Sequence, residues 1–221
     1  YLLSQADVDD FSGHYPACNE IAGNMLIKGQ TITSLYGLSQ LNTLNGNLKI
    51  DNTLVYTLHG LENLVSVSGD LRITSNDSLT SIESLNNLNV IGGNLELGDY
   101  SSTCGELTLY GNIVLEDLEG LNNLTEIGGN LRIFGNHSLV DMGELQGVNS
   151  IGKDLSIGYN EGLESLTGLN NITYIPGNLS IIGFYYDSTI SLTGLENLVN
   201  IGGSLMVQAV LTDDFTGLGS L

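Results

Sequence analysis

The residues with the most reactive side chains are few and scattered. The histidines are His14, His59 and His137, and the cysteines are Cys18 and Cys104. Metal binding and nucleophilic catalysis need several such groups converging on one point, and these five residues show neither the number nor the spacing. The carboxylates do not cluster at one position in a way that indicates a polysaccharide-cleaving groove. We expect no catalytic residues, no cofactor and no metal, and therefore no enzyme.

Aromatic and basic side chains indicate a site for noncovalent recognition instead. Exposed aromatic rings bury a large area at low entropy cost, so they serve well as interface anchors. The candidate residues for partner binding are Tyr100, Tyr110, Phe134, Tyr159, Phe184, Tyr185, Tyr186, Lys49, Arg72 and Arg132. A purely structural role is the alternative for both groups. The rings would then pack over the flank of the fold, and the cations would pair across strands, as Arg72 with Glu96.

The charge of the chain narrows the class of partner. The formal net charge is −20, from 25 acidic and 5 basic residues, so phosphate backbones and anionic membrane surfaces are repelled. No apolar run reaches the roughly 18 residues of a membrane span. Residues 1–5 lack the basic and apolar regions of a signal peptide, which predicts a mature or trimmed chain. We expect a protein or glycan ligand, no nucleic acid and no direct membrane insertion of this segment.

One recurring phrase predicts the elements that position these side chains. It reads IGGNLEL at 91–97 and IGGNLRI at 127–133. Its leucine anchors eight copies, at Met25, Leu48, Leu71, Leu95, Leu131, Leu155, Leu179 and Leu205, with steps of 23, 23, 24, 36, 24, 24 and 26 residues. A repeat of this length is typical of a solenoid. The first apolar residue of a second phrase, SLxGLxxL, stands 13 residues before each later anchor, so the variation in length falls on the other edge of each coil.

The anchor phrase alternates apolar and variable residues, as in Leu48-Lys49-Ile50, which predicts a short strand with every second side chain in the core. The side chains between would form an outward column of Leu26, Lys49, Arg72, Glu96, Thr108, Arg132, Ser156, Ser180 and Met206. The glycine before each strand predicts a corner without room for a side chain. The asparagines after the strands, Asn76, Asn136 and Asn160, with Asn52 one position early, predict turn residues that satisfy backbone groups. Glycosylation is the alternative for those in Asn-x-Ser/Thr sequons, at Asn76, Asn123, Asn136, Asn171 and Asn178.

The ends of the solenoid and one insertion depart from the repeat. Residues 1–20 are predicted to be an N-terminal cap, with a capping box at Ser4 to Asp7 opening a short helix over 4–11, and residues 21–221 a single solenoid domain. The C-terminal coil has no comparable cap, so further chain or a neighbour would cover it. Between Leu95 and Leu131 there are 12 extra residues, and Leu107 fits a ninth anchor reached by a short-cut coil or a hairpin. A Cys18–Cys104 disulfide is expected only if this insertion folds back.

These features together predict an all-β leucine-rich solenoid of about eight coils with a short N-terminal capping helix. The copies, such as Gly120-Leu-Asn-Asn-Leu124 followed by Ile127-Gly-Gly-Asn-Leu131, resemble the receptor L-domain of insulin-receptor and EGF-receptor ectodomains, which implies a right-handed β-helix-like fold. They also resemble repeats in bacterial surface and fungal cell-wall proteins. The resemblance covers residues 18–221 and implies an extracellular or cell-surface, noncatalytic, partner-binding protein. The cysteine-rich modules and kinase of hormone receptors are absent from the sequence. We therefore expect a receptor-like or adhesin module, with a structural component of a cell wall, surface layer or appendage as the alternative.

Overall fold

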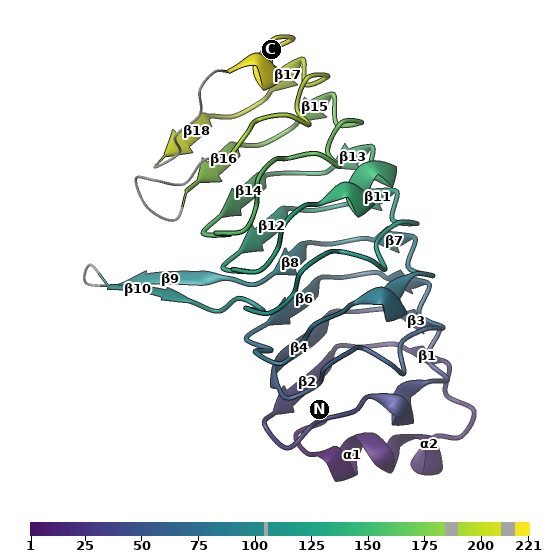
Figure 1. Cartoon of the computed structure of the whole chain (residues 1–221). Helices are drawn as coiled ribbons and strands as arrows, with labels where there is room; N and C mark the ends of the chain where they lie inside the picture. Colours follow the sequence, from purple (N-terminus) through teal and green to yellow (C-terminus); the bar gives the residue numbers. More distant parts are fainter. Residues whose placement is uncertain (104–105, 184–189, 209–214) are drawn as a thin grey trace.

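The chain folds as a β-solenoid whose turns stack into an elongated molecule (Figure 1). The computed structural model describes residues 1–103, 106–183, 190–208 and 215–221. The turns follow one another from the N-terminal helices at one end to the C-terminus at the other. The predicted all-β solenoid of about eight coils with a short N-terminal helix is confirmed.

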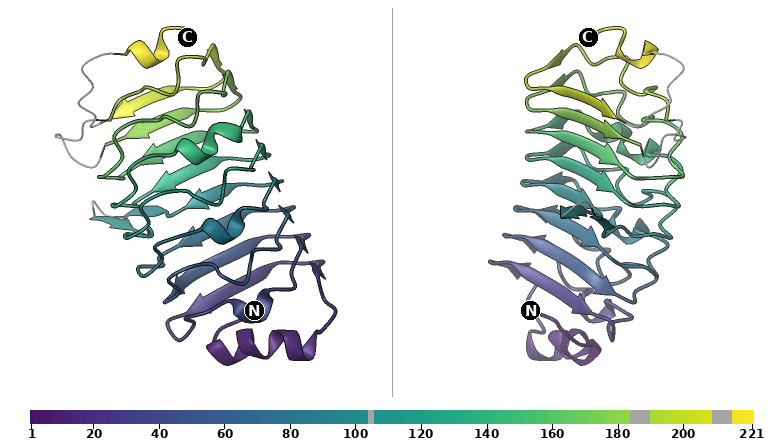
Figure 2. Two further views of the ribbon diagram at one scale, coloured as in Figure 1. Left: turned by 45° about the vertical axis from the view of Figure 1, so that its right-hand side comes forward. Right: turned by 90° about the vertical axis from the view of Figure 1, so that its left-hand side faces the viewer.

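The longer of the two main sheets contains eight parallel strands, one from each turn. They are β2 (Met25–Gly29), β4 (Leu48–Thr53), β6 (Leu71–Thr74), β8 (Leu95–Leu97), β12 (Leu131–Phe134), β14 (Leu155–Gly158), β16 (Leu179–Ile182) and β18 (Leu205–Gln208). The right-hand view of Figure 2 shows these strands side by side. Leu48 lies opposite Leu71, and Leu95 opposite Leu131, so the predicted register is confirmed. A slip of one residue would turn the core side chains out to solvent.

A second sheet of two-residue strands forms another side of the solenoid. Its six parallel strands are β1 (Glu20–Ile21), β3 (Thr43–Leu44), β5 (Ser66–Val67), β7 (Val90–Ile91), β11 (Glu126–Ile127) and β13 (Ser150–Ile151). A separate parallel pair joins β15 (Tyr174–Ile175) to β17 (Asn200–Ile201). Short 3₁₀ turns occur between the strands, at η1 (Tyr36–Leu38), η2 (Glu83–Leu85), η3 (Gly143–Gly147) and η4 (Thr216–Leu218). The 3₁₀ turns belong to the SLxGLxxL phrase, in which apolar residues recur every third position, as 3₁₀ geometry requires.

The core is one continuous column of leucine and isoleucine side chains. Leu48, Leu71, Leu131 and Leu155 are each no more than 2% exposed. A single turn has no means of burying its own apolar face, so each turn depends on its neighbours for most of its hydrophobic stabilisation. The sequence is therefore periodic because every turn must supply apolar side chains to the same shared core.

A polar ladder that the sequence did not predict runs along the corner before the longer sheet. The backbone N–H of Asp70 donates to Asn47 Oδ1 at 2.8 Å, and that of Asn94 donates to Asp70 Oδ1 at 2.9 Å. The same bond recurs from Asn24 to Ser204, through Asn47, Asp70, Asn94, Asn130, Asp154 and Asn178. A Cβ on Gly69 would lie 2.1 Å from Asn47 Oδ1, so the predicted crowded glycine corner is confirmed.

A second ladder, after the strands, contains the predicted asparagines. Its members are Asn76, Asn112, Asn136 and Asn160, and each side-chain oxygen accepts a hydrogen bond from a backbone N–H of the preceding turn. The place predicted for Asn52 belongs to Thr53, whose N–H and hydroxyl both donate to Asn76 Oδ1. The sequon asparagines Asn76 and Asn136 are fully buried, so neither is accessible to glycosylation in the folded chain.

The N-terminal end of the solenoid is covered by two short helices, α1 (Gln5–Asp9) and α2 (Phe11–His14). The Ser4 side chain accepts a hydrogen bond from Asp7 N–H, which confirms the predicted capping box. Val8 and Phe11 are buried, as predicted for a lid over the first turn. Leu2 N–H also donates to Leu26 O at 2.8 Å, so the chain covers the outer edge of β2.

An antiparallel hairpin, β9 (Tyr100–Thr103) and β10 (Glu106–Leu109), projects sideways from the middle of the stack (Figure 1). Leu107 pairs with Ser102 in this hairpin and is 45% exposed, so its prediction as a ninth anchor is wrong. Thr108 likewise stands outside the outward column of the parallel sheet. Residues 105–112 resemble 129–136 in sequence. However, β10 pairs with β9 and not with the strands of the neighbouring turns. Of this segment, Asn112 occupies the place in the asparagine ladder that the repeat predicts.

The hairpin is inserted into one turn without changing the length of the rest of that turn. Leu95 and Leu131 are 36 residues apart, whereas Leu131 and Leu155 are 24 residues apart. The difference of 12 residues equals the length of the segment 99–110. The ends of the insertion lie close together, since a Cβ on Gly98 would be 3.0 Å from Gly111 Cα. The hairpin therefore leaves the coil and rejoins it at nearly the same point.

Candidate ligand-binding groove

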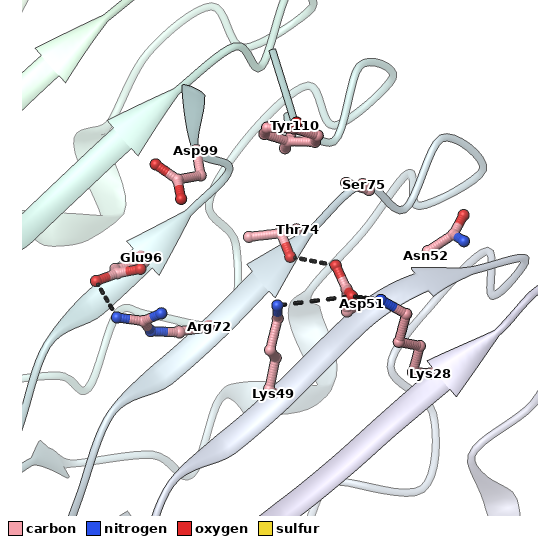
Figure 3. Close-up of a pocket in the computed structure, with 10 residues that line it drawn as sticks. All are labelled: Lys28, Lys49, Asp51, Asn52, Arg72, Thr74, Ser75, Glu96, Asp99 and Tyr110. Carbon is pink, nitrogen blue, oxygen red and sulfur yellow. Dashed lines mark hydrogen bonds and ion pairs between the residues drawn. The ribbon is translucent and has the colours of Figure 1, made fainter. Parts of the chain in front are cut away.

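A groove opens on the outward face of the longer sheet, between its first strands and the base of the hairpin (Figure 3). Its volume is about 500 Å³. The lining residues are Lys28, Lys49, Asp51, Asn52, Arg72, Thr74, Ser75, Glu96, Asp99 and Tyr110. Ligand pockets typically occupy about 300–1,000 Å³, so the groove is large enough for a small ligand or for part of a larger one.

Strand pairing arranges the outward side chains of the floor in two ranks. The first rank is the predicted outward column, in which Lys49 lies opposite Arg72, and Arg72 opposite Glu96. The second rank stands two residues further along each strand, where Asp51 lies opposite Lys28 on one side and Thr74 on the other. Both ranks face the same way because side chains two residues apart share one face of a strand.

The base of the hairpin closes the groove on one side. Tyr110 N–H donates to Asp99 O at 2.8 Å, which ties the two ends of the hairpin together. Ser75 N–H donates to Tyr110 O at 3.0 Å, which joins the hairpin to the end of β6. Figure 3 shows Asp99 and Tyr110 standing beyond the ranks of charged residues on the strands. The groove therefore combines residues of four adjacent turns with an element that interrupts the repeat.

Ion pairs hold the floor of the groove together. Asp51 Oδ2 lies 2.7 Å from Lys28 Nζ and 3.6 Å from Lys49 Nζ, and Asp51 Oδ1 accepts a hydrogen bond from Thr74 Oγ1 at 2.8 Å. Arg72 Nη2 donates to Glu96 Oε1 at 2.9 Å. The structural alternative for Arg72, pairing with Glu96 on the adjacent strand, is confirmed. The pairing fixes this cation in the groove and leaves part of its side chain exposed.

The fold changes the acidity of the two buried carboxyls in opposite directions. Burial raises the pKa of Glu96 above its usual value, and the opposing charges of Arg72 and Arg132 do not offset it. Burial acts in the same direction on Asp51, but hydrogen bonds from Lys28 and Thr74 outweigh it, so the pKa of Asp51 lies below its usual value. Asp51 is therefore a firmly ionised partner for the lysines, whereas burial disfavours the ionised form of Glu96.

Three of the predicted aromatic residues form a cluster beside the groove. The ring of Tyr100 lies 4.9 Å from that of Phe134 and 5.5 Å from that of Tyr159, measured between centroids. Phe134 is only 1% exposed, so its role is structural. Arg132 packs 5.4 Å from the Phe134 centroid and pairs with Asp99 Oδ1 at 3.0 Å. The cluster therefore fixes the hairpin against the sheet and positions the wall of the groove.

The ten predicted binding residues thus separate into three sets. Lys49, Arg72 and Tyr110 line the groove, and Tyr100, Phe134, Tyr159 and Arg132 support its wall. Phe184, Tyr185 and Tyr186 lie outside the described residues. Cys18 is a free thiol. Cys104, with which a disulfide is expected only if the insertion folds back, also lies outside the described residues.

Comparisons with known proteins identify no relative. No family model, no curated protein and no solved structure matches the chain. The resemblance of the repeat to the receptor L-domain therefore remains a prediction, and the function must be inferred from the groove.

Two further observations concern the described part of the chain. Within it, no group of three or more histidine, cysteine, aspartate or glutamate side chains is placed to hold a metal ion. No helix among the same residues has the length and apolar character needed to cross a membrane.

Several groove residues were not predicted, although the sequence contained a signal for some of them. Asp51 and Thr74 follow Lys49 and Arg72 by two residues, so the period of a strand places each pair on one face. Asp99 and Tyr110 had no such signal, because only the return of the hairpin brings them together. The lining also includes Asp51, Glu96 and Asp99, which come from three different positions of the repeat.

Proposed function

We propose that this protein is a noncatalytic extracellular binding module that recognises a glycan through the groove at the base of the hairpin. One observation supports the proposal above all: three of the five basic residues of the chain line this groove, together with Asp51, Glu96 and Asp99. Hydroxyl, amide and phenol groups complete the lining. Such a surface offers many donors and acceptors in fixed positions, and a hydroxyl-rich ligand needs both.

The geometry favours a glycan over an extended peptide. A peptide commonly binds by adding a strand to an open sheet edge. The floor strands β4, β6 and β8 are each paired on both sides, so they have no open edge in the groove. Recognition there depends on side chains alone.

The noncatalytic and extracellular parts of the proposal have separate support. Asp51 and Glu96 are both engaged in ion pairs with basic groups of the floor, which suits carboxylates that shape a binding surface. The extracellular location is inferred from the resemblance of the repeat to receptor L-domains and to surface proteins of bacteria and fungi. The noncatalytic inference is tested together with the glycan itself.

The test is a glycan array probed with the wild-type protein and with a variant that lacks residues 99–110, in which Gly98 is joined to Gly111. The deletion restores the 24-residue step of the neighbouring turn and removes Asp99 and Tyr110 from the groove. We expect the wild type to bind a set of related glycans saturably and the variant to bind them at least tenfold more weakly, because one wall is lost. Tyr56→Ala, which removes a 66% exposed ring outside the groove, is the control and should bind normally.

Each other outcome contradicts a definite part of the proposal. If the wild type binds no glycan, the assignment is wrong. Full binding by the deletion variant would place the site elsewhere. Release of new reducing ends from a bound glycan would overturn the noncatalytic assignment. Self-association without glycan binding would favour a structural component of a wall or surface layer.

A further inference from the structure

The distribution of charge singles out the groove within a very acidic molecule. The chain has 25 acidic and 5 basic residues, so most of its surface repels anions. Lys28, Lys49 and Arg72 line the groove, and Arg132 pairs with Asp99 at its rim. The fifth basic residue, Lys153, lies in the turn before β14. Four of the five cations are therefore gathered at or beside one site.

The cations and acids of the groove differ in depth. The carboxylate side chains of Asp51 and Glu96 are 10% and 6% exposed, whereas those of Lys28, Lys49 and Arg72 are 49%, 40% and 40% exposed. The third acid of the lining, Asp99, is 41% exposed, and its carboxylate pairs with Arg132. The two buried acids, Asp51 and Glu96, hold the cations in place. On the floor of the groove a ligand therefore meets more exposed positive charge than negative charge, although the lining contains as many acids as bases.

The exposed cations retain donors for a ligand. Among the described residues, the one ionic partner of Lys49 is Asp51, and the distance of 3.6 Å exceeds that of a hydrogen bond. Arg72 uses Nη2 for Glu96, and its Nε lies 3.7 Å from Asp70, so part of its five-donor fork stays available. A guanidinium and an ammonium on adjacent strands form a suitable pair of donors for one anionic group.

We propose that the groove binds an acidic saccharide, with the anionic group of a sugar ring held by Lys49 and Arg72 and the hydroxyls of the ring bonded by the other polar side chains. This inference rests on the proposed function and narrows the glycan to one chemical class. The anionic group is a carboxylate, as in a uronic or sialic acid, or a sulfate ester. Tyr110, which is 41% exposed at the hairpin end of the groove, offers an aromatic edge to the ring.

The rest of the lining favours a sugar over a free inorganic anion. Asn52, Thr74 and Ser75 add amide and hydroxyl groups around the cations, and a small ion would not reach them all. The negative field of the molecule also works against any anion that is bound by charge alone. A ligand in this groove therefore needs neutral hydrogen-bonding groups as well as its charge.

The experiment measures binding to pairs of glycans that differ only in the anionic group. The pairs are an oligogalacturonate and its methyl ester, a sialylated glycan and its desialylated form, and a sulfated glycan and its unsulfated form. We expect at least one acidic member to bind at least tenfold more tightly than its neutral counterpart, and the pair concerned identifies the anion. Lys49→Gln should remove most of this preference with little effect on folding, because Lys49 has only a weak ionic contact. Arg72→Gln should have the same effect on the preference.

Lys153→Gln is the matched control, since it removes the same charge from a residue outside the groove and should leave the preference intact. If neutral and acidic members bind equally, or only neutral members bind, the acidic class is wrong while the glycan-binding function stands. If no member binds although another glycan on the array does, the acidic class is wrong and the glycan-binding function stands. If nothing on the array binds either, both proposals are wrong. If Lys153→Gln weakens binding as much as Lys49→Gln does, the preference reflects net charge, and the assignment to the groove is overturned.

Discussion

At the scale of single residues, Glu96 shows how the repeat produces a functional surface from an ordinary outward position. Its backbone belongs to the parallel sheet like that of every other residue in the outward column. The hairpin follows β8 directly, and Glu96 interacts with Arg72 and Arg132. Glu96 is only 5% exposed, whereas Lys49, Arg72 and Arg132 in the same column are partly exposed. The burial makes its charge costly and its ion pair with Arg72 well defined.

The raised pKa of Glu96 predicts a dependence of stability on pH. A carboxyl with a raised pKa binds its proton more tightly in the folded state than in the unfolded state. Its contribution to stability is therefore greatest below the ordinary pKa of 4.5 and is lost as the pH rises through the raised value. Glu96→Gln removes this effect. We expect the free energy of unfolding of the wild type, relative to Glu96→Gln, to fall between about pH 4.5 and neutral pH.

Urea denaturation at several pH values measures this difference. Glu126→Gln, in an exposed position on β11, makes the same change of charge and is the control. Its difference from the wild type gives the effect of removing one exposed carboxylate from the acidic chain. A constant difference between the wild type and Glu96→Gln over the same range would show that burial does not dominate the acidity of Glu96.

At the scale of elements, the asparagine ladder joins neighbouring turns through side-chain hydrogen bonds. Asn112 Oδ1 accepts hydrogen bonds from the backbone and side chain of Asn76, and Asn112 Nδ2 donates to Ile73 O at 2.9 Å. Asn112 is also the residue at which the chain resumes the coil after the hairpin. The Asn112 side chain therefore connects the turn that carries the hairpin to the preceding turn.

Replacing Asn112 by alanine should be strongly destabilising. The change leaves the buried Asn76 N–H without an acceptor, and an unsatisfied buried group costs about 1–3 kcal/mol. It also removes one of the two hydrogen bonds to Ile73 C=O, which still accepts from Gly98 N–H, and a lost hydrogen bond of this kind costs about 1 kcal/mol. We expect Asn112→Ala to lower the free energy of unfolding by about 2–4 kcal/mol in chemical denaturation. Asn123→Ala removes an exposed asparagine with a hydrogen bond to Asn86 O and should cost less than about 1 kcal/mol. Equal losses in the two variants would contradict a special role for the buried ladder.

At the scale of the whole molecule, the net charge of −20 opposes the compact fold through repulsion between carboxylates. Salt screens such repulsion, while the few ion pairs of the groove are partly buried and lose less. We expect the midpoint of thermal unfolding at neutral pH to rise by several degrees when sodium chloride is increased from about 10 mM to about 500 mM. Differential scanning calorimetry measures the change.

The control for this prediction uses the acidity of the chain itself. Near the sequence pI of about 4.1 the net charge vanishes, so the same increase in salt should shift the midpoint far less. A midpoint that falls with salt at neutral pH would show that local ion pairs outweigh the overall repulsion.

The fold could be predicted in detail because the same sequence pattern is repeated in every turn. Leu48, Leu71 and Leu131 recur with their neighbours in nearly constant phase, and only a stack of turns buries all of them together. The prediction for Leu107 was wrong because the residues around it match those around the anchor Leu131. A local match of eight residues does not decide whether a strand joins its neighbouring turns or pairs with the segment just before it.

The sequence by itself determined the architecture, the register of the strands, the crowded glycine corners and the column that contains Lys49 and Arg72. Each of these follows from local spacing repeated from turn to turn, so every copy supports the same interpretation. The tertiary structure alone decided that Asp99 and Tyr110 close a groove over this column, and that Tyr100 and Phe134 support it from behind. A hairpin occurs only once, and where its ends and side chains come to rest depends on contacts between residues far apart in the sequence, which no periodicity encodes.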